Sequence, residues 1–291
     1  MTAYTKRLQK VTAVLCTTAL LAGCAAGTSD NTEPAATTAP VKAITIEPTA
    51  AYQTMNGFGA SACWWSQEVG NWENAKDILS LLYDENSGIG LNIYRYNLGA
   101  GSKDDATITD PDRRAEAFID KDGSYHWERD AAAQNALALA KSMNKDLRVT
   151  LFSNSAPVFY TANGKAYCDY LPDEENYVTN LEPERYADFA KYGIACAKHF
   201  TEAGYRVTGL SPINEPEWSW RGYEDGTAKQ EGCYYSKTQC RDLYKVFLKQ
   251  MAQEDALRDC RLEGWESGHI GTDTCCLLYT SPSPRDMRRS R

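Results

Sequence analysis

The segment Leu210-Ser211-Pro212-Ile213-Asn214-Glu215-Pro216 places a carboxyl group directly after an apolar, strand-like run. A carboxyl group at the carboxyl end of a strand can face a cleft and protonate the leaving oxygen of a glycosidic bond. Such an acid needs a raised pKa, which partial burial and a neighbouring carboxylate supply. Asn214 can orient a sugar hydroxyl, and Pro216 stiffens the turn. Glu215 is therefore a candidate general acid, and the alternative is a glutamate that caps a helix or forms a salt bridge.

Strand-like and helix-like segments alternate along the chain. The spacing predicts a strand that ends near 60, strands over 90–96, 147–153, 207–213 and 261–265, and helices over 73–83, 131–143, 184–200 and 236–251. Repeated strand–helix units predict parallel strands joined by right-handed crossovers. A Rossmann fold shares this rhythm, but no strand is followed by G-x-G-x-x-G, and the sequence contains no P-loop motif.

Polar and aromatic side chains follow each of the five predicted strands. They are Ser61 and Trp64, Arg95 and Asn97, Asn154 and Ser155, Asn214 and Glu215, and Glu266. In an α/β fold of the (β/α)8 TIM-barrel type, the active site lies at the carboxyl ends of the strands. We therefore predict a TIM barrel that gathers these side chains at one end. Because a closed barrel needs eight strands, the five strands found here are expected to form an incomplete barrel.

Four segments resemble glycoside hydrolase family 30 and follow one another in that family's order. They are residues 52–61 (YQTMNGFGAS), 92–99 (NIYRYNLG), 153–157 (SNSAP) and 214–216 (NEP). Each segment is a weak signal alone, but the four in order are specific, and the resemblance covers 51–268. The stretch Gln230-Glu231-Gly232-Cys233, which follows Trp218 and Trp220, is similar to the endo-β-1,6-galactanase branch of the family.

The resemblance implies retaining hydrolysis in a (β/α)8 barrel with an attached β-sandwich. It implies that Glu215 is the general acid/base and that Asn214 contacts the hydroxyl next to the reacting carbon. Arg95 matches an arginine that steadies the nucleophile carboxylate of the family. A fixed guanidinium would keep that carboxylate ionised by lowering its pKa.

Three further residues, Trp64, Asn154 and Trp218, match positions that line the sugar sites of the family. Core packing is the alternative for the two tryptophans. The family's nucleophile lies at the end of the seventh strand, beyond the five strands predicted here. Glu266 is therefore predicted to contact substrate; its acting as the nucleophile, which would need a carboxyl separation of about 5–5.5 Å from Glu215, is the less favoured alternative.

Residues 1–23 have the pattern of a lipoprotein signal peptide. Lys6, Arg7 and Lys10 precede a short apolar stretch, and Leu21-Ala22-Gly23-Cys24 resembles a bacterial lipobox. We expect cleavage before Cys24, lipidation of its sulfur and anchoring of the exported protein to a membrane of the cell envelope. An ordinary secretory signal with an incidental cysteine is the alternative.

The rest of the chain divides into three predicted parts. Residues 24–43 comprise the lipidated cysteine and a tether rich in Ala, Thr and Pro. Residues 44–275 form the partial TIM-barrel domain. Residues 276–291 lack the strand–helix rhythm and resemble a vector-derived tail, so we expect them to be non-native; a genuine C-terminal tail is the alternative.

Composition excludes a nucleic-acid partner, because 31 Lys and Arg face 39 Asp and Glu in 291 residues, for a net charge of −8. The cysteines beyond Cys16 and Cys24 match no zinc pattern, so thiols with one or two disulfides are expected. His126, His199 and His269 share no ligand spacing, and we predict neither a metal nor another cofactor. The charged runs 103–105 and 173–175 are expected on solvated loops.

These observations favour a retaining endo-glycosidase that acts on β-1,6-linked galactan of the arabinogalactan type, held at a membrane by its lipid. Other activities found in the same family, namely β-1,6-glucanase, glucosylceramidase and xylanase, stay open. A non-catalytic glycan-binding surface lipoprotein is the alternative from another class of protein. The candidate acid Glu215 favours catalysis over binding alone.

Overall fold

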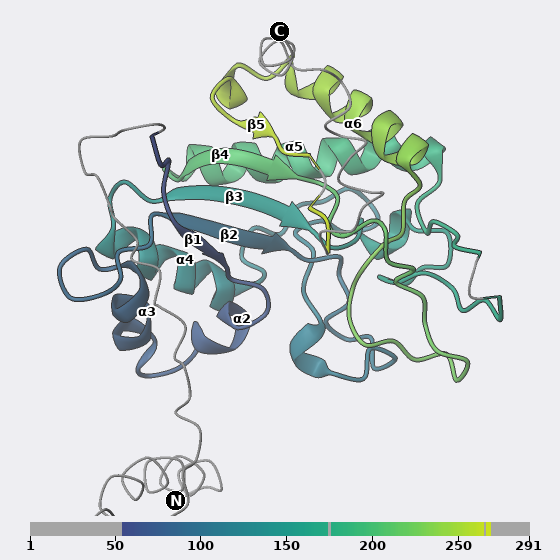
Figure 1. Cartoon of the computed structure of the whole chain (residues 1–291), viewed down its shortest axis with the longest axis horizontal. Coiled ribbons are helices and arrows are strands. Elements are labelled where there is room, and N and C mark those ends of the chain that lie inside the picture. The colour runs from purple at the N-terminus through teal and green to yellow at the C-terminus, as the bar shows by residue number, and fades with distance from the viewer. Residues whose placement is uncertain (1–53, 174–175, 265, 269–291) are drawn as a thin grey trace, which may run out of the picture. The chain divides into compact units, whose positions relative to one another are not determined.

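The computed structural model describes residues 54–173, 176–264 and 266–268. Its strands are all parallel and follow chain order in one sheet (Figure 1): β1 (Gly59–Ser61), β2 (Ile93–Leu98), β3 (Arg148–Ser153), β4 (Arg206–Ser211) and β5 (Arg261–Leu262). A doubly wound Rossmann sheet reverses its strand order at a switch point, whereas this sheet does not. The sequential order is that of a TIM barrel, so the predicted fold class is confirmed.

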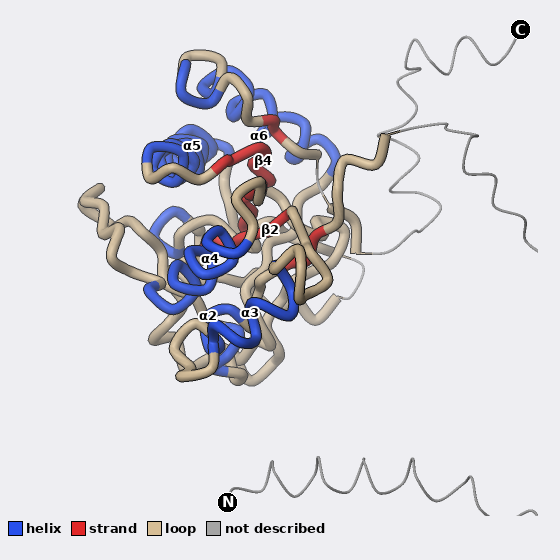
Figure 2. Tube along the Cα trace, turned by 90° about the vertical axis from the view of Figure 1, so that its left-hand side faces the viewer, coloured by secondary structure: helices blue, strands red, loops and turns tan. Residues whose placement is uncertain are grey.

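Helices connect the strands, as the strand–helix rhythm predicts. They are α2 (Ser66–Val69), α3 (Ala75–Tyr83), α4 (Ala131–Met143), α5 (Tyr186–Glu202) and α6 (Lys237–Met251), with single 3-10 turns at Pro111–Arg113, Val158–Tyr160, Pro183–Arg185 and Asp255–Leu257. In Figures 1 and 2, α3 and α4 lie alongside β1 and β2, and α5 and α6 lie alongside β4 and β5. The single turn α2 lacks the apolar periodicity that revealed the longer helices, and the sequence did not predict it.

The start of α6 follows directly from its sequence. The Ser236 hydroxyl accepts a hydrogen bond from the Gln239 amide at 3.3 Å, and the Gln239 side chain accepts one from the Ser236 amide at 2.8 Å. This capping box satisfies two backbone donors that a helix leaves without partners. The helix therefore begins where the pattern predicts.

The side chains of β2 alternate between the core on one face of the sheet and the candidate site on the other face. Tyr94, Tyr96 and Leu98 are fully buried in the core that the helices cover, and the Tyr96 ring lies 5.0 Å from that of Phe200 in α5. Successive side chains of a strand point to opposite faces, so Arg95 lies on the other face of the sheet. In barrel geometry that face is the interior, where the candidate site residues are expected.

The connections at the carboxyl ends of the strands are long. Residues 99–130, 154–185 and 212–236 join β2 to α4, β3 to α5 and β4 to α6, and they gather where the arrowheads of these strands point (Figure 1). No helix in the described ranges is long and apolar enough to cross a membrane. The predicted leader, Cys24, the tether and the predicted tail all fall outside the described residues.

Candidate active site

Three hydrogen bonds hold the Glu215 backbone just beyond the end of β4, one of them from the Trp218 amide to the Glu215 carbonyl at 3.2 Å. The Glu215 amide donates to the Glu266 carbonyl at 2.7 Å, which pairs the neighbouring Asn214 with Glu266 in a parallel bridge. The Glu215 carbonyl also accepts a hydrogen bond from the Trp220 indole at 2.7 Å. Glu215 adopts a φ of 46°, a left-handed conformation that costs free energy for a residue other than glycine. Strain of this kind is common where a side chain must be aimed at a functional site.

The environment of Glu215 favours its protonated form. Partial burial raises the pKa of its carboxyl group, and the negative charges of Glu217 and Glu266 raise it further, against an opposing effect of Arg95. Glu217 is held beside it by a hydrogen bond from the Ser267 hydroxyl at 2.6 Å. A carboxyl group that keeps its proton to a higher pH than an ordinary glutamate is suited to act as a general acid.

Arg95 joins three elements at the carboxyl edge of the sheet. Its guanidinium donates to the Asn214 side-chain carbonyl at 2.8 Å and to the Ser61 hydroxyl at 3.2 Å, and it forms an ion pair with Glu266. The guanidinium also lies 3.2 Å from the ring centre of Phe152. Within the described residues, the carboxylate that Arg95 holds is thus that of Glu266. No local sequence pattern predicts the pairing of Arg95 with Glu266, because it arises from the register between the segments after β4 and β5.

Two asparagines continue the row of polar side chains across the sheet. The Asn214 amide donates to the Asn154 side-chain carbonyl at 3.2 Å, and the Asn154 amide donates to that of Asn97 at 3.0 Å. Asn154 is only 5% exposed, so its role in this structure is to orient the Asn214 side chain through their hydrogen bond. Residues within β2 and just after β3, β4 and β5 therefore meet in one connected row at the carboxyl edge of the sheet, as expected for strand ends of a barrel.

A cavity of about 420 Å³ opens beside Glu215. Sites for small molecules usually have volumes of this size and combine aromatic walls with a few polar groups. The remaining lining comes from the 212–236 connection: Trp218, Ser219, Trp220, Arg221, Tyr223, Ala228, Lys229 and Gln230. Polar side chains among aromatic rings can meet both the hydroxyl edge and the apolar face of a sugar.

The two candidate tryptophans lie in different surroundings. Trp218 is 48% exposed and lines the cavity, so core packing does not explain it. Trp64 does not line this cavity; it is half-buried, with the Arg113 guanidinium 5.8 Å from its ring centre. The adjacent Trp65 is the tryptophan that packs against the core. Of the two candidate tryptophans, the described fold thus brings Trp218, and not Trp64, to the cavity beside Glu215.

Glu231, in the motif that resembles the galactanase branch, is completely buried. It accepts hydrogen bonds from the Ala100 amide at 3.1 Å and the Ser102 hydroxyl at 2.6 Å. Burial raises its pKa to about 8, in spite of these hydrogen bonds. Glu231 therefore fastens the 212–236 connection, which forms the cavity, to the 99–130 connection.

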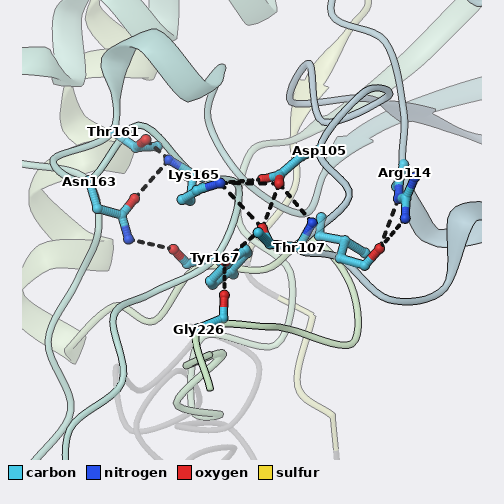
Figure 3. A network of polar contacts seen from close by, with 9 residues as sticks. Asp105, Thr107, Arg114, Thr161, Asn163, Lys165, Tyr167 and Gly226 are labelled. Carbon is cyan, nitrogen blue, oxygen red and sulfur yellow. Dashed lines mark hydrogen bonds and ion pairs between the residues drawn. The ribbon is translucent and has the colours of Figure 1, made fainter. Parts of the chain in front are cut away.

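A second polar network, which we call the loop clamp, joins all three long connections (Figure 3). Asp105 forms an ion pair with Lys165 at 3.1 Å and accepts a hydrogen bond from Thr107 at 2.5 Å. The Thr107 and Tyr167 hydroxyls lie 2.9 Å apart, and the Tyr167 hydroxyl donates to the Gly226 carbonyl at 2.9 Å. The loop clamp comprises these four side chains and the Gly226 carbonyl.

The loop clamp corrects one expectation. The run 103–105 was expected to be solvated, but the Asp105 side chain is only 16% exposed. Burial opposes its ionisation, yet the bonds from Thr107 and Lys165 outweigh burial and lower the pKa of Asp105. Its partner Lys165 lies far away along the chain, so no local pattern could reveal the contact. In the run 173–175, residues 174 and 175 lie outside the described part of the chain.

The described cysteines, Cys63, Cys168, Cys196, Cys233, Cys240 and Cys260, all carry free thiols in this structure. In the part of the chain that the structure describes, no three His, Cys, Asp or Glu side chains are grouped so as to hold a metal ion.

Residues 41–264 match the model of O-glycosyl hydrolase family 30. An endo-β-1,6-galactanase of Hypocrea rufa is 30% identical over 218 residues, which cover 66% of this chain and 43% of that protein. An exo-β-1,6-galactobiohydrolase of Bifidobacterium longum subsp. longum is 27% identical over 242 residues, which cover 62% of this chain and 16% of that protein.

Among solved structures, a conserved exported protein from Bacteroides fragilis superposes with a TM-score of 0.68 at 26% identity. The match covers 77% of this chain and 46% of that structure. The chain therefore spans less than half the length of each of these relatives.

Proposed function

Because the chain belongs to O-glycosyl hydrolase family 30, we propose that the whole protein is a retaining endo-glycosidase of β-1,6-linked galactan with Glu215 as its general acid/base. The observation that carries this proposal is the half-buried Glu215, with its raised pKa, at the end of β4 beside a cavity of about 420 Å³. Two relatives whose names specify β-1,6-linked galactose support the choice of sugar.

In the proposed first step, Glu215 donates its proton to the glycosidic oxygen while a second carboxylate attacks the anomeric carbon from the opposite face. In the second step, Glu215 removes a proton from the water that replaces that carboxylate, so the sugar keeps its configuration. The resemblance puts the nucleophile on a seventh strand, which is not among the described strands. Glu266, paired with Arg95, is proposed to contact substrate and to position Arg95.

The proposed contact of Asn214 with the substrate follows from its hydrogen bonds. Its side-chain carbonyl accepts from Arg95 and its amide donates to Asn154, which together fix the plane of the amide group. The second amide hydrogen can then donate to a hydroxyl next to the reacting carbon. A hydrogen bond that strengthens as charge develops on the sugar accelerates the reaction.

The test of the proposed function uses the full-length protein with three polymers: β-1,6-galactan, β-1,6-glucan and xylan. We expect galacto-oligosaccharides of several lengths from the galactan. Turnover of glucan or xylan alone would reassign the sugar. If the protein binds galactan but hydrolyses none of the three polymers, the result would support a non-catalytic glycan-binding protein and contradict the proposal.

We also propose that Cys24 is lipidated and anchors the exported protein to a membrane. The leader pattern and the lipobox-like segment support this proposal. Cells fed a labelled fatty acid should label the wild-type protein and Cys16→Ser, whose change lies inside the leader, but not Cys24→Ser. Equal labelling of all three proteins, or label in none, would contradict the proposal.

A further inference from the structure

Three segments of the long connections meet around Cys168. The Cys168 amide donates to the Trp220 carbonyl at 2.8 Å, and the Cys168 carbonyl accepts from the Gly222 amide at 2.8 Å. The Tyr234 amide donates to the Cys168 sulfur at 3.4 Å. Cys168 is thus paired with Arg221 in a parallel bridge, and its backbone and its sulfur are both held by the 212–236 connection, whose residues line the cavity beside Glu215.

Cys233 directly precedes Tyr234, so its side chain lies beside that of Cys168, and the two thiols interact electrostatically. The two residues, Cys168 and Cys233, are only 2% and 1% exposed. The Thr179 hydroxyl lies 3.8 Å from the Cys233 sulfur. Two thiols held in contact from segments about 65 residues apart in the sequence are in position to be joined covalently.

The two thiols differ in acidity. Burial opposes ionisation of Cys233, but its interactions with Cys168, the Asn180 amide and the Thr179 hydroxyl outweigh burial and lower its pKa. The pKa of Cys168 is raised by its hydrogen bond to Cys233 and by burial.

We propose that Cys168 and Cys233 form a disulfide in the exported protein, joining the 154–185 connection to the 212–236 connection, which lines the Glu215 cavity. The proposal rests on the export proposed above, because disulfides persist in oxidising compartments. It does not depend on which glycan the protein cleaves.

The reaction needs an external disulfide as oxidant, such as a dithiol oxidase of the export compartment or glutathione disulfide. The thiolate of one of the two cysteines attacks one oxidant sulfur and expels the other as a thiolate. The thiolate of the second cysteine then displaces the first oxidant sulfur and closes the new S–S bond. Two thiols are oxidised, one external disulfide is reduced to two thiols, and the protons pass to those thiols. Because both cysteines are buried once folded, the reaction belongs to the folding stage.

Peptide masses test the proposal directly. The protein is expressed with its leader, unfolded without reductant in the presence of a thiol-alkylating reagent, and digested with trypsin. Trypsin places Cys168 in the peptide 166–185 and Cys233 in the peptide 230–237, each with a single cysteine. We expect one linked species, lighter than the two free peptides together by two hydrogen atoms, which reductant separates. Complete alkylation of both cysteines in the exported protein would overturn the proposal.

Two controls keep the result interpretable. Cys196→Ala changes another buried cysteine and should leave the linked species intact, whereas Cys168→Ala should leave Cys233 fully alkylated. If the leader fails to export the chain, purified protein refolded with glutathione and glutathione disulfide should still form the linkage. Its absence there would contradict the proposal whatever the activity of the protein. Reduction should lower the melting temperature of the linked protein by roughly 5–10 °C and leave Cys168→Ala unchanged.

Discussion

The sheet carries a cavity toward each end of its strands, and the two cavities differ in what surrounds their carboxyl groups. The cavity at the amino end has a volume of about 590 Å³ and includes Arg148, Arg206, Arg261 and Glu263, whereas the one beside Glu215 has a volume of about 420 Å³. Burial raises the pKa of Glu263 as it does that of Glu215. Neither the volume of a cavity nor a carboxyl group with a raised pKa is therefore enough to identify which of the two cavities is the active site.

The surroundings of the two carboxyl groups do distinguish them. Glu263 accepts a hydrogen bond from Thr150 at 3.2 Å, and no aromatic residue lines its cavity. Glu215 instead lies beside Trp218 and Trp220. A buried carboxyl group becomes a candidate catalyst when its environment can also hold a substrate, and only the carboxyl end of the sheet meets that condition.

The largest expected effect on activity is that of replacing the Glu215 carboxyl group by an amide, and the same replacement at Glu263 is the control. Glu215→Gln should lower kcat/KM on β-1,6-galactan about 10²–10⁴-fold, because the amide cannot donate the proton that the leaving oxygen needs. Glu263→Gln, the matched control in the cavity that lacks aromatic residues, should change kcat/KM by less than about threefold. Steady-state kinetics of both variants check the comparison, and equal losses would break it.

A smaller loss is expected from Arg95→Lys. Lysine keeps the charge but cannot reach Glu266, Asn214 and Ser61 together with one planar fork, so the row of side chains loses its alignment. We expect kcat/KM to fall roughly 10–100-fold with little change in melting temperature. A fall in melting temperature that accounts for the lost activity would assign Arg95 to stability alone.

The pH dependence of kcat/KM tests the environment of Glu215 in a variant that keeps Glu215 itself. The negative charge of Glu217 raises the pKa of Glu215, so Glu217→Gln should lower that pKa. Glu215 must be protonated to act as an acid, and the basic limb of the kcat/KM profile should therefore move to lower pH. A basic limb that stays in place, or moves to higher pH, would contradict the proposed origin of the raised pKa.

The smallest effect on activity is expected at Glu231, whose role is structural. Its pKa is about 8 in the folded protein, above the usual 4.5, so its contribution to stability is present below pH 4.5 and is lost as the pH rises through 8. The melting temperature of the wild type should fall between pH 5 and pH 8, and Glu231→Gln should reduce that fall. Thermal unfolding at several pH values measures the difference, and parallel curves would count against it.

Much of the fold could be predicted because its signals are local. Apolar periodicity locates the longer helices, Ser236 and Gln239 mark the start of α6, and polar residues after each strand indicate the carboxyl end of the sheet. The pairing of Arg95 with Glu266 depends on strand register, which no local pattern encodes. The burial of Asp105 depends likewise on a lysine from another connection.

The most direct measurement of the central claim is azide rescue of Glu215→Ala on an aryl β-1,6-galactobioside with a good leaving group. Such a substrate needs no acid in the first step, so the glycosyl-enzyme still forms and azide can replace the water that Glu215 would activate. The account predicts a rate that increases with azide and a glycosyl azide of β configuration. A glycosyl azide of α configuration, or no rescue by azide, would contradict the assignment of Glu215 as the acid/base.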